Sequence, residues 1–317
     1  MVKISSGSPS SSGGGSRILL LGKSGQVGWE LQRTLSPLGE LIALGRQQLD
    51  LTRPDQIRAR VREIKPGLIV NAAAYTAVDR AEDEPDLAMA INGTAPGLLA
   101  EEANRMNATL IHYSTDYVFG ENVGSGLPSS GYTEEMEPHP LNVYGQTKLA
   151  GERAVQATAR SYLILRTSWV YGSRGNNFLL TILRLARERE ELKVVDDQIG
   201  APTWSRMIAE ATAQIVARSS SAASMKEASG LYHLAAAGRT TWYRFAQSIL
   251  KHDTSPHCRL KRLLPITTAD YPTRARRPAF GLLNCGKLSR AFGLALPNWE
   301  TGLASALREI HADDEKF

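Results

Sequence analysis

The chain has 317 residues, of which 42% are hydrophobic and 22% charged, and its formal net charge is +5. The length suits one large domain or a domain with a smaller lobe. The sequence contains no run of 18 apolar residues, so no membrane span is predicted. The mild, dispersed positive charge favours an anionic small molecule over nucleic acid, and the two cysteines, Cys258 and Cys285, favour a reduced, cytoplasmic protein.

The N-terminal part divides into a polar leader and a strand–turn–helix unit. Residues 1–16 contain seven serines and four glycines, which predicts a disordered leader or linker. An apolar run over 17–22 predicts a buried parallel strand, and helical periodicity follows Gly28. Gly22, Gly25 and Gly28 are spaced as Gly-x-x-Gly-x-x-Gly. Such a turn is typical of a dinucleotide fold, where the backbone approaches a pyrophosphate at a helix N-terminus; the alternative is an ordinary glycine-rich turn.

The tip of the second predicted strand, 40–44, carries Gly45 and Arg46. In an NAD enzyme an acid at this point holds the ribose hydroxyls. Here no carboxylate would repel a 2′-phosphate, and the guanidinium of Arg46 would bind one. The pattern favours NADPH over NADH, and the alternative is that Arg46 is a solvated loop charge. Asp50 and Leu51 follow in position to reach the adenine.

Two further predicted strands end in small or polar residues at the same edge. The strand over 68–74 ends in three alanines, and the strand over 109–116 ends in Thr115 and Asp116. Small side chains leave room for a cofactor, and the Thr115 hydroxyl is a candidate donor to a substrate oxygen. The alternatives are tight helix–sheet packing for the alanines and capping of the next turn for Thr115 and Asp116.

Tyr144 and Lys148 lie four residues apart in a predicted helix over 144–158, so they share one helix face. A nearby ammonium stabilises a phenolate and lowers the pKa of the tyrosine. The pair is therefore a candidate for passing a proton to or from a carbonyl or alcohol oxygen. The alternative is an amphipathic helix with one aromatic residue and one exposed lysine.

Aromatic and basic residues mark the C-terminal half. Trp169, near the end of a predicted strand over 162–172, is a candidate surface for stacking a substrate ring, or alternatively a core residue. Arg274, Arg276 and Arg277 gather in one loop near the end of the chain. They predict a clamp for a diphosphate, with a solvated basic loop as the alternative.

The alternation of strands and helices weakens after Gly172, which predicts two parts. We expect a dinucleotide-binding domain over 17–172, to which some later segments return, and mostly a substrate-binding lobe over 173–317. The fold class is α/β, a doubly wound parallel sheet with a smaller C-terminal lobe.

Seven segments carry a resemblance to a known family, at 22–32, 71–79, 112–119, 141–152, 166–171, 197–203 and 275–278. Through them, residues 17–311 resemble the dTDP-4-dehydrorhamnose reductases, which are extended short-chain dehydrogenase/reductases. The last two segments, Asp-Gln-Ile-Gly-Ala-Pro-Thr and Ala-Arg-Arg-Pro, lie in the expected substrate lobe. Related nucleotide-sugar enzymes diverge there, so these segments favour this substrate.

The resemblance implies a Rossmann-type fold and the last step of dTDP-L-rhamnose synthesis, the NADPH-dependent reduction of the C4 keto group of dTDP-4-dehydro-L-rhamnose. It implies that Tyr144 protonates the resulting oxygen, that Lys148 lowers the pKa of Tyr144 and holds the nicotinamide ribose, and that Thr115 lies beside the carbonyl. The predicted substrate-binding residues are Thr115, Asp116, Trp169, Asn177, Arg276 and Arg277. The predicted cofactor-binding residues are Gly22, Gly25, Gln26, Val27, Gly28, Arg46, Asp50, Leu51, Ala72, Ala73, Ala74, Tyr144 and Lys148.

The chain departs from the family pattern at two points. Members that accept NADH tend to carry an acid where this chain has Gly45, which supports NADPH and leaves NADH as the second choice. Some members share a magnesium-bridged dimer built from glutamates, but Trp204-Ser205-Arg206 offers no acid at the corresponding place. We therefore assign no metal site, leave magnesium use open, and expect a monomer or a homodimer that binds neither nucleic acid nor membrane.

Two other functions are compatible with the same fold. One is a non-catalytic regulator, because the regulatory subunit of methionine adenosyltransferase resembles this family and acts by binding a partner. The presence of Tyr144, Lys148 and Thr115 argues against it. The other is a different extended sugar-nucleotide enzyme, such as an epimerase or a dehydratase. A dehydratase would need a glutamate after Asp116, where this chain has tyrosine.

Overall fold

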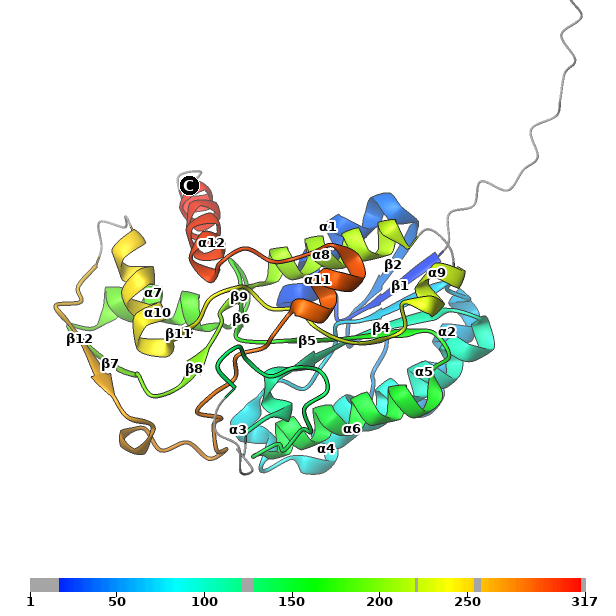
Figure 1. Cartoon of the computed structure of the whole chain (residues 1–317), viewed down its shortest axis with the longest axis horizontal. Helices are drawn as coiled ribbons and strands as arrows, with labels where there is room; N and C mark the ends of the chain where they lie inside the picture. The colour runs from blue at the N-terminus through cyan, green and yellow to red at the C-terminus, as the bar shows by residue number, and fades with distance from the viewer. Residues whose placement is uncertain (1–16, 121–127, 220–221, 254–257, 315–317) are drawn as a thin grey trace, which may run out of the picture.

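A parallel sheet of six strands forms the centre of the protein (Figure 1). The structure, a computed structural model, describes residues 17–120, 128–219, 222–253 and 258–314, so the predicted leader over 1–16 lies outside the described residues. The strand order is β10-β5-β4-β3-β1-β2, and every neighbouring pair is parallel. The strands are β1 (Arg17–Leu21), β2 (Glu40–Leu44), β3 (Leu68–Asn71), β4 (Thr109–Thr115), β5 (Tyr162–Thr167) and β10 (Gly230–His233). The predicted α/β class with a doubly wound parallel sheet is confirmed.

Helices cover both faces of the sheet, which is why its strands are unbroken apolar runs. In β1, Ile18 and Leu20 pack into one core and Leu19 and Leu21 into the other, because successive side chains point to opposite faces. The helices of the first face are α1 (Gln26–Leu35), α8 (Ser205–Arg218) and α11 (Gly286–Phe292). Those of the second face are α2 (Pro54–Ile64), α5 (Ala95–Met106) and α6 (Val143–Thr158).

The order of the strands places a crevice at one edge of the sheet. The chain passes from β1 to β2 on one side and then returns to β3 on the other side of β1. Connections that leave β1 and β3 therefore diverge at the carboxyl ends of these strands, which is where ligands bind in open α/β sheets.

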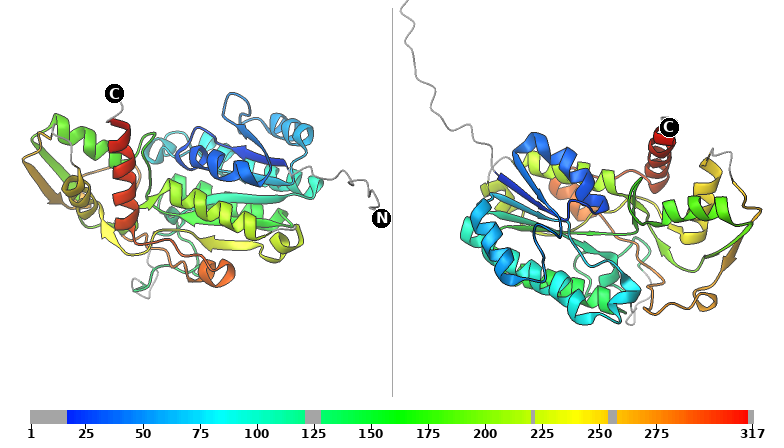
Figure 2. Two further views of the ribbon diagram at one scale, coloured as in Figure 1. Left: turned by 90° about the horizontal axis from the view of Figure 1, so that it is seen from above. Right: turned by 180° about the vertical axis from the view of Figure 1, so that it is seen from behind.

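A second lobe with its own core lies beside the sheet (Figure 2). Buried aromatic side chains from several segments meet in it, among them Tyr171, Phe245 and Trp299. Its helices are α7 (Phe178–Glu188), α10 (Trp242–His252) and α12 (Trp299–Asp314). Its strands pair as β6 (Val170–Tyr171) with β9 (Thr203–Trp204), β7 (Glu191–Val195) with β12 (Arg262–Ile266), and β8 (Ile199–Gly200) with β11 (Thr240–Thr241). Later segments also return to the sheet, because α8, β10 and α11 all pack there.

Short elements complete the described part of the chain. They are η1 (Ser36–Leu38), α3 (Val78–Ala81), α4 (Pro85–Met89), the π-helical turn η2 (Ala90–Thr94), η3 (Asp116–Val118), α9 (Ala222–Glu227) and η4 (Thr268–Asp270). Within the described residues, no helix has both the length and the apolar character needed to cross a membrane.

Candidate active site

A cavity of about 610 Å³ opens at the carboxyl ends of β1 and β3, where the sheet topology places a crevice. Its wall combines the glycine turn, the tip of β2, the segment after β3 and the start of α6. Twelve of the thirteen predicted cofactor-binding residues line it: Gly22, Gly25, Gln26, Val27, Arg46, Asp50, Leu51, Ala72, Ala73, Ala74, Tyr144 and Lys148. Residues spread over more than 120 positions of the sequence thus line one cavity.

The glycine turn brings backbone close to the cavity. Gly22 has φ +81°, and a Cβ there would run into the backbone of Ala73. Gly28 is not on the wall; a Cβ on it would strike the carbonyl oxygen of Gly22, so Gly28 lets α1 pack against the turn. Gly25 is the N-cap of α1 and has no side chain to cap the first turn. The N–H groups at the start of this ten-residue helix therefore have no side-chain cap, as at helix N-termini that bind anions.

Two cations lie at the tip of β2. Arg46 is exposed and lines the cavity. The side chain of Lys23 passes over Gly45, because a Cβ built on Gly45 would lie 3.6 Å from its Cε. Asp50 accepts hydrogen bonds from the N–H and hydroxyl of Thr52, and the backbone bond in particular keeps the pKa of its carboxyl below the ordinary value. The predicted site for a 2′-phosphate thus has a second cation, Lys23, which the strand pattern did not reveal.

Tyr144 and Thr115 lie close together at the N-terminal end of α6. The side chain of Asn142 caps this helix by accepting from the N–H of Gly145 at 2.8 Å, which places Tyr144 in the first turn. The side chain of Thr115, at the end of β4, lies beside that of Tyr144. Burial raises the pKa of Tyr144 above its ordinary value, and the neighbouring Thr115 hydroxyl opposes this only in part. The phenol is therefore protonated at neutral pH.

Lys148 also lines the cavity, but its contacts are with β4 and not with Tyr144. Its Nζ donates to the carbonyl oxygen of Tyr113 at 2.6 Å and lies 3.3 Å from Nε2 of His112. Burial lowers the pKa of Lys148 to about 8, and Glu152 acts in the opposite direction. Burial raises the pKa of the Tyr144 phenol above its ordinary value, and that Lys148 lowers this pKa stays a prediction.

Asp116 lies behind Thr115, enclosed by protein. Its side chain is 2% exposed, and Oδ1 accepts from the Thr115 hydroxyl at 3.1 Å. A Cβ on Gly281 would run into the other carboxyl oxygen. Burial raises the pKa of Asp116 to about 7, although hydrogen bonds from Thr115 and nearby N–H groups oppose it. Asp116 is therefore placed to orient Thr115.

Trp169 sits between the sheet and the second lobe with a strained backbone. Its φ is +45°, which is uncommon for a non-glycine residue and marks a position held by its surroundings. The indole stacks on Trp242 of α10, with ring centroids 3.6 Å apart and an interplanar angle of 7°. A Cβ on Gly200 would strike the Trp169 ring. The stacked pair joins the segment after β5 to α10 of the second lobe.

Asn177 and the arginine loop are engaged with protein groups. Asn177 caps α7 through its side-chain oxygen, and its amide nitrogen donates to Gln26 Oε1 at 3.1 Å and Gly172 O at 2.9 Å. Arg277 forms an ion pair with Asp79 at 2.6 Å, and Arg274 pairs with Asp83. These three residues therefore tie loops together, and their predicted contact with substrate stays a prediction.

The backbone of Arg276 fastens the same loop to α6. Its carbonyl oxygen accepts from Nδ2 of Asn142 at 2.8 Å, while its side chain is exposed. The loop is thus held beside the first turn of α6, the turn that contains Tyr144.

Two hydroxyls on the cavity wall were missed by sequence reasoning. Ser114 and Thr167, at the carboxyl ends of β4 and β5, line the cavity, and their buried oxygens have no hydrogen-bond partner among the described residues. Buried polar atoms are usually hydrogen-bonded, so this pair indicates a ligand with polar groups. Their places at strand ends next to Thr115 and Trp169 were the available signal.

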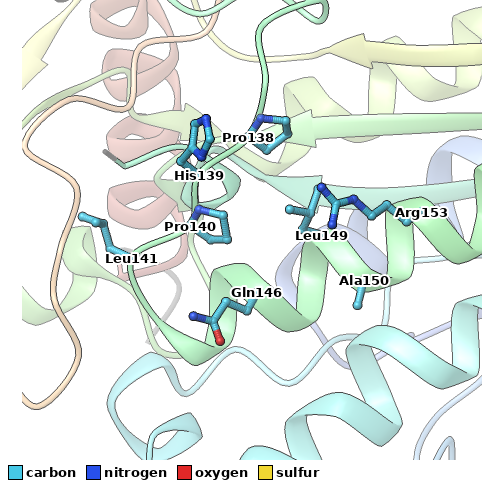
Figure 3. A pocket seen from close by; sticks show the side chains of 8 residues that line it. All are labelled: Pro138, His139, Pro140, Leu141, Gln146, Leu149, Ala150 and Arg153. Carbon is cyan, nitrogen blue, oxygen red and sulfur yellow. The ribbon is translucent and has the colours of Figure 1, made fainter. Parts of the chain in front are cut away.

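A larger hollow lies on another face of α6 (Figure 3). It has a volume of about 770 Å³ and is lined by Pro138, His139, Pro140, Leu141, Gln146, Leu149, Ala150 and Arg153. None of the predicted site residues lines it, and the glycine turn contributes nothing to it. In the described part of the chain, no three His, Cys, Asp or Glu side chains gather as a metal would require.

Comparison with known proteins identifies the family. The family described as RmlD substrate binding domain matches residues 16–312. The chain is 47% identical over 302 residues to dTDP-4-dehydrorhamnose reductase of Shigella flexneri, covering 92% of this chain and 97% of that protein. It is also 47% identical over 299 residues to the protein of the same name from Escherichia coli (strain K12), with 92% and 97% covered.

A solved structure agrees with this assignment. The fold is similar, with a TM-score of 0.84, to a crystal structure of dTDP-4-dehydrorhamnose reductase from Bacillus anthracis str. Ames in complex with NADP. That protein is 36% identical, and the match covers 93% of this chain and 99% of that one. The resemblance expected from the seven sequence segments is thereby confirmed, and the chain belongs to the RmlD substrate binding domain family.

Proposed function

We propose that the protein is a dTDP-4-dehydrorhamnose reductase, which uses NADPH to reduce the C4 keto group of dTDP-4-dehydro-L-rhamnose to dTDP-L-rhamnose. The observation that carries the proposal is a cavity built on a dinucleotide turn, with Tyr144 and Lys148 on its wall and Thr115 beside Tyr144. Relatives of this name that span nearly the whole chain support it.

The cavity fits a dinucleotide of the NADP type. The open start of α1 and the close approach of Gly22 to Ala73 suit a pyrophosphate, while Lys23 and Arg46 suit a 2′-phosphate. The unpaired hydroxyls of Ser114 and Thr167 are available to polar groups deeper in the cavity. When bound, NADPH supplies the hydride. The NADP-bound relative supports this cofactor, and NADH is the weaker alternative.

Tyr144 is the proposed proton donor. Because burial raises the pKa of its phenol, the side chain holds its proton at neutral pH and has it ready for the sugar oxygen. Thr115 touches the same phenol and is therefore placed to hydrogen-bond the same sugar oxygen. Asp116 accepts from Thr115 and thereby orients that hydroxyl. Lys148 is proposed to hold the nicotinamide ribose, since its amine lines the cavity one helical turn from Tyr144.

The second lobe is proposed to receive the nucleotide sugar. Trp169 and Trp242 form an aromatic wall at the junction of the two lobes, and such a surface stacks on flat or apolar ring faces. Arg276 and Arg277 lie in a loop fastened beside the first turn of α6 and are proposed to contact the diphosphate. Asn177 is assigned a positioning role instead, because it links Gln26 of the glycine turn to α7.

A two-cofactor assay tests the function. Purified protein is mixed with dTDP-4-dehydro-6-deoxy-L-mannose, and the loss of reduced-nicotinamide absorbance is followed with NADPH and NADH in separate reactions. Oxidation of NADPH with formation of dTDP-L-rhamnose is expected. If neither cofactor is oxidised, the enzyme assignment is wrong, and the non-catalytic regulator or another extended sugar-nucleotide enzyme becomes the better interpretation. Equal rates with both cofactors contradict the role given to Arg46.

The proposal also includes the cellular location and the oligomeric state of the protein. Both cysteines, Cys258 and Cys285, are free thiols, which supports a cytoplasmic location. A monomer or a homodimer is proposed, with magnesium use left to a chelation experiment.

A further inference from the structure

One arginine joins three helices on the side of the sheet that α1 and α8 cover. Arg206, in the first turn of α8, donates through Nε to Oε2 of Glu30 in α1 at 3.2 Å. Through Nη2 it donates to Oε1 of Glu309 in α12 at 2.9 Å. Since α1 covers the sheet and α12 packs in the second lobe, a single guanidinium links the two parts of the molecule. The proposed reaction uses none of these three residues.

The surroundings hold this guanidinium in place. The side chains of Glu30, Arg206 and Glu309 are 6%, 30% and 22% exposed. The guanidinium of Arg206 lies over the ring of Trp204, 5.1 Å from its centroid, and the hydroxyl of Ser173 donates to Oε1 of Glu309 at 2.9 Å. Solvent ions screen partly buried pairs much less than exposed ones, so the two carboxylates feel the full charge of Arg206.

The charges around the two glutamates leave little attraction for a metal ion. Oε2 of Glu30 also lies 3.6 Å from Nη2 of Arg33, a nitrogen that is 3.4 Å from the exposed carboxylate of Glu210. Oε2 of Glu309 is buried and has no hydrogen-bond partner among the described residues. Magnesium requires a nearly octahedral set of oxygens at about 2.0–2.1 Å. A divalent ion at the open oxygen of Glu309 would stand beside the fixed positive charge of Arg206, which repels it.

We propose that Arg206 supplies the positive charge between Glu30 and Glu309 that a divalent metal would otherwise supply, so that this protein folds and assembles without magnesium. A guanidinium stays charged at every pH near neutrality, and its donors point in fixed directions, so it holds both carboxylates permanently. In the part of the chain that the structure describes, no further acidic, histidine or cysteine side chain completes a metal site with them. The magnesium-bridged dimer of some family members therefore does not fit the residues present here.

Metal binding is tested on the full-length protein without cofactor or substrate, by titration with Mn²⁺ while electron paramagnetic resonance follows the free ion. Wild type and Glu309→Gln should bind the same amount of Mn²⁺. A Mn²⁺ ion that wild type binds and Glu309→Gln does not bind overturns the proposal.

The role of the arginine itself is tested by reversing its charge. Arg206→Glu should bind one additional Mn²⁺, because the substitution removes the guanidinium and adds a third carboxylate. Arg184→Glu is the matched control, since it places a carboxylate beside Glu188 on the exposed surface of α7 and should add no Mn²⁺ site. If Arg206→Glu binds no more Mn²⁺ than Arg184→Glu does, the arginine is not what excludes the metal and the proposal is rejected.

Assembly and stability are tested by chelation. The sedimentation coefficient and Tm of wild type should be the same in EDTA and in magnesium, because a chelator cannot remove a guanidinium. Arg206→Gln should lower Tm by about 2–4 °C in both solutions, whereas magnesium should raise the Tm of Arg206→Glu, which it binds. A wild type that dissociates or loses Tm in EDTA contradicts the proposal. None of these readouts uses enzyme activity, so they do not depend on the proposed function.

Discussion

The hydroxyl of Thr115, at the carboxyl end of β4, lies beside the phenol of Tyr144 in the first turn of α6. The two residues are 29 positions apart, as their numbers show, and only the packing of α6 against the sheet joins them. This proximity links the residue proposed to hold the sugar oxygen to the residue proposed to protonate it. The first prediction follows from it.

Tyr144→Phe should lower kcat by roughly 100- to 10,000-fold, because the ring keeps its packing and loses the proton it donates. Binding of NADPH should be little changed, since the hydroxyl faces Thr115 and the glycine turn is untouched. Steady-state kinetics and fluorescence titration measure the two effects. Tyr232→Phe is the matched control, because this tyrosine does not line the cavity and its hydroxyl donates to the carbonyl oxygen of Ala228. A Tyr144→Phe enzyme with a near-normal rate would disprove the assignment.

Arg46→Ala should raise the KM for NADPH about tenfold and leave the KM for NADH nearly unchanged, because a charge-assisted bond to the 2′-phosphate is lost. Lys23→Ala should act in the same direction, since its side chain passes over Gly45. Gly45→Asp should go further and favour NADH, because a carboxylate there repels the phosphate and accepts from the ribose hydroxyls. Equal loss with both cofactors after Arg46→Ala would mean that the arginine supports the fold only.

The raised pKa of Asp116 predicts that the protein loses stability as the pH rises. Its pKa is raised from 3.8 in the unfolded reference to about 7 in the folded protein, so the folded state binds the extra proton between these values. The free energy of unfolding should therefore fall between about pH 4 and pH 7, by roughly 2–4 kcal/mol from this group, and then level off. Denaturant titrations at several pH values measure it. In Asp116→Asn this contribution should disappear, and an unchanged slope would exclude Asp116 as its source.

Arg166→Gln should destabilise the protein by about 3–5 kcal/mol, because it leaves the buried carboxylate of Glu152 without its partner. The two side chains are 3% and 1% exposed, and the pair joins β5 to α6. Arg184→Gln breaks an ion pair of the same residue types on the surface of α7, where the side chains are 60% and 50% exposed, and should cost at most about 0.5 kcal/mol. Similar losses in both variants would contradict the importance of burial.

The local patterns predicted much of the fold and most of the cavity wall. Unbroken apolar runs such as Ile18–Leu21 require burial on both faces, and glycines at 22, 25 and 28 suit one kind of turn. Those constraints act over a few neighbouring residues, so they are visible in sequence. The place of the cavity then follows from the strand order, because ligands bind at the carboxyl ends of parallel strands where the connections diverge.

The protonation states of the site residues and the ion pairs of the basic loop could not be predicted from local sequence patterns. The expectation that Lys148 lowers the pKa of Tyr144 came from their spacing on one helix, whereas burial has the largest effect on the pKa of both groups. The basic loop near the C-terminus was expected to be free for a diphosphate, yet Arg277 pairs with Asp79, 198 positions away. Neither the burial of Tyr144 and Lys148 nor the pairing of Arg277 with Asp79 follows from a local sequence pattern.

By itself the sequence determined the α/β class, the dinucleotide turn, the family and the candidate proton donor, because each depends on residue types at short spacings. Only the tertiary structure decided which groups surround Lys148, that Lys23 joins Arg46, and that Trp169 meets Trp242. The physical reason is that desolvation and hydrogen-bond partners depend on atoms brought together from distant segments, and these set the protonation state and orientation of each side chain.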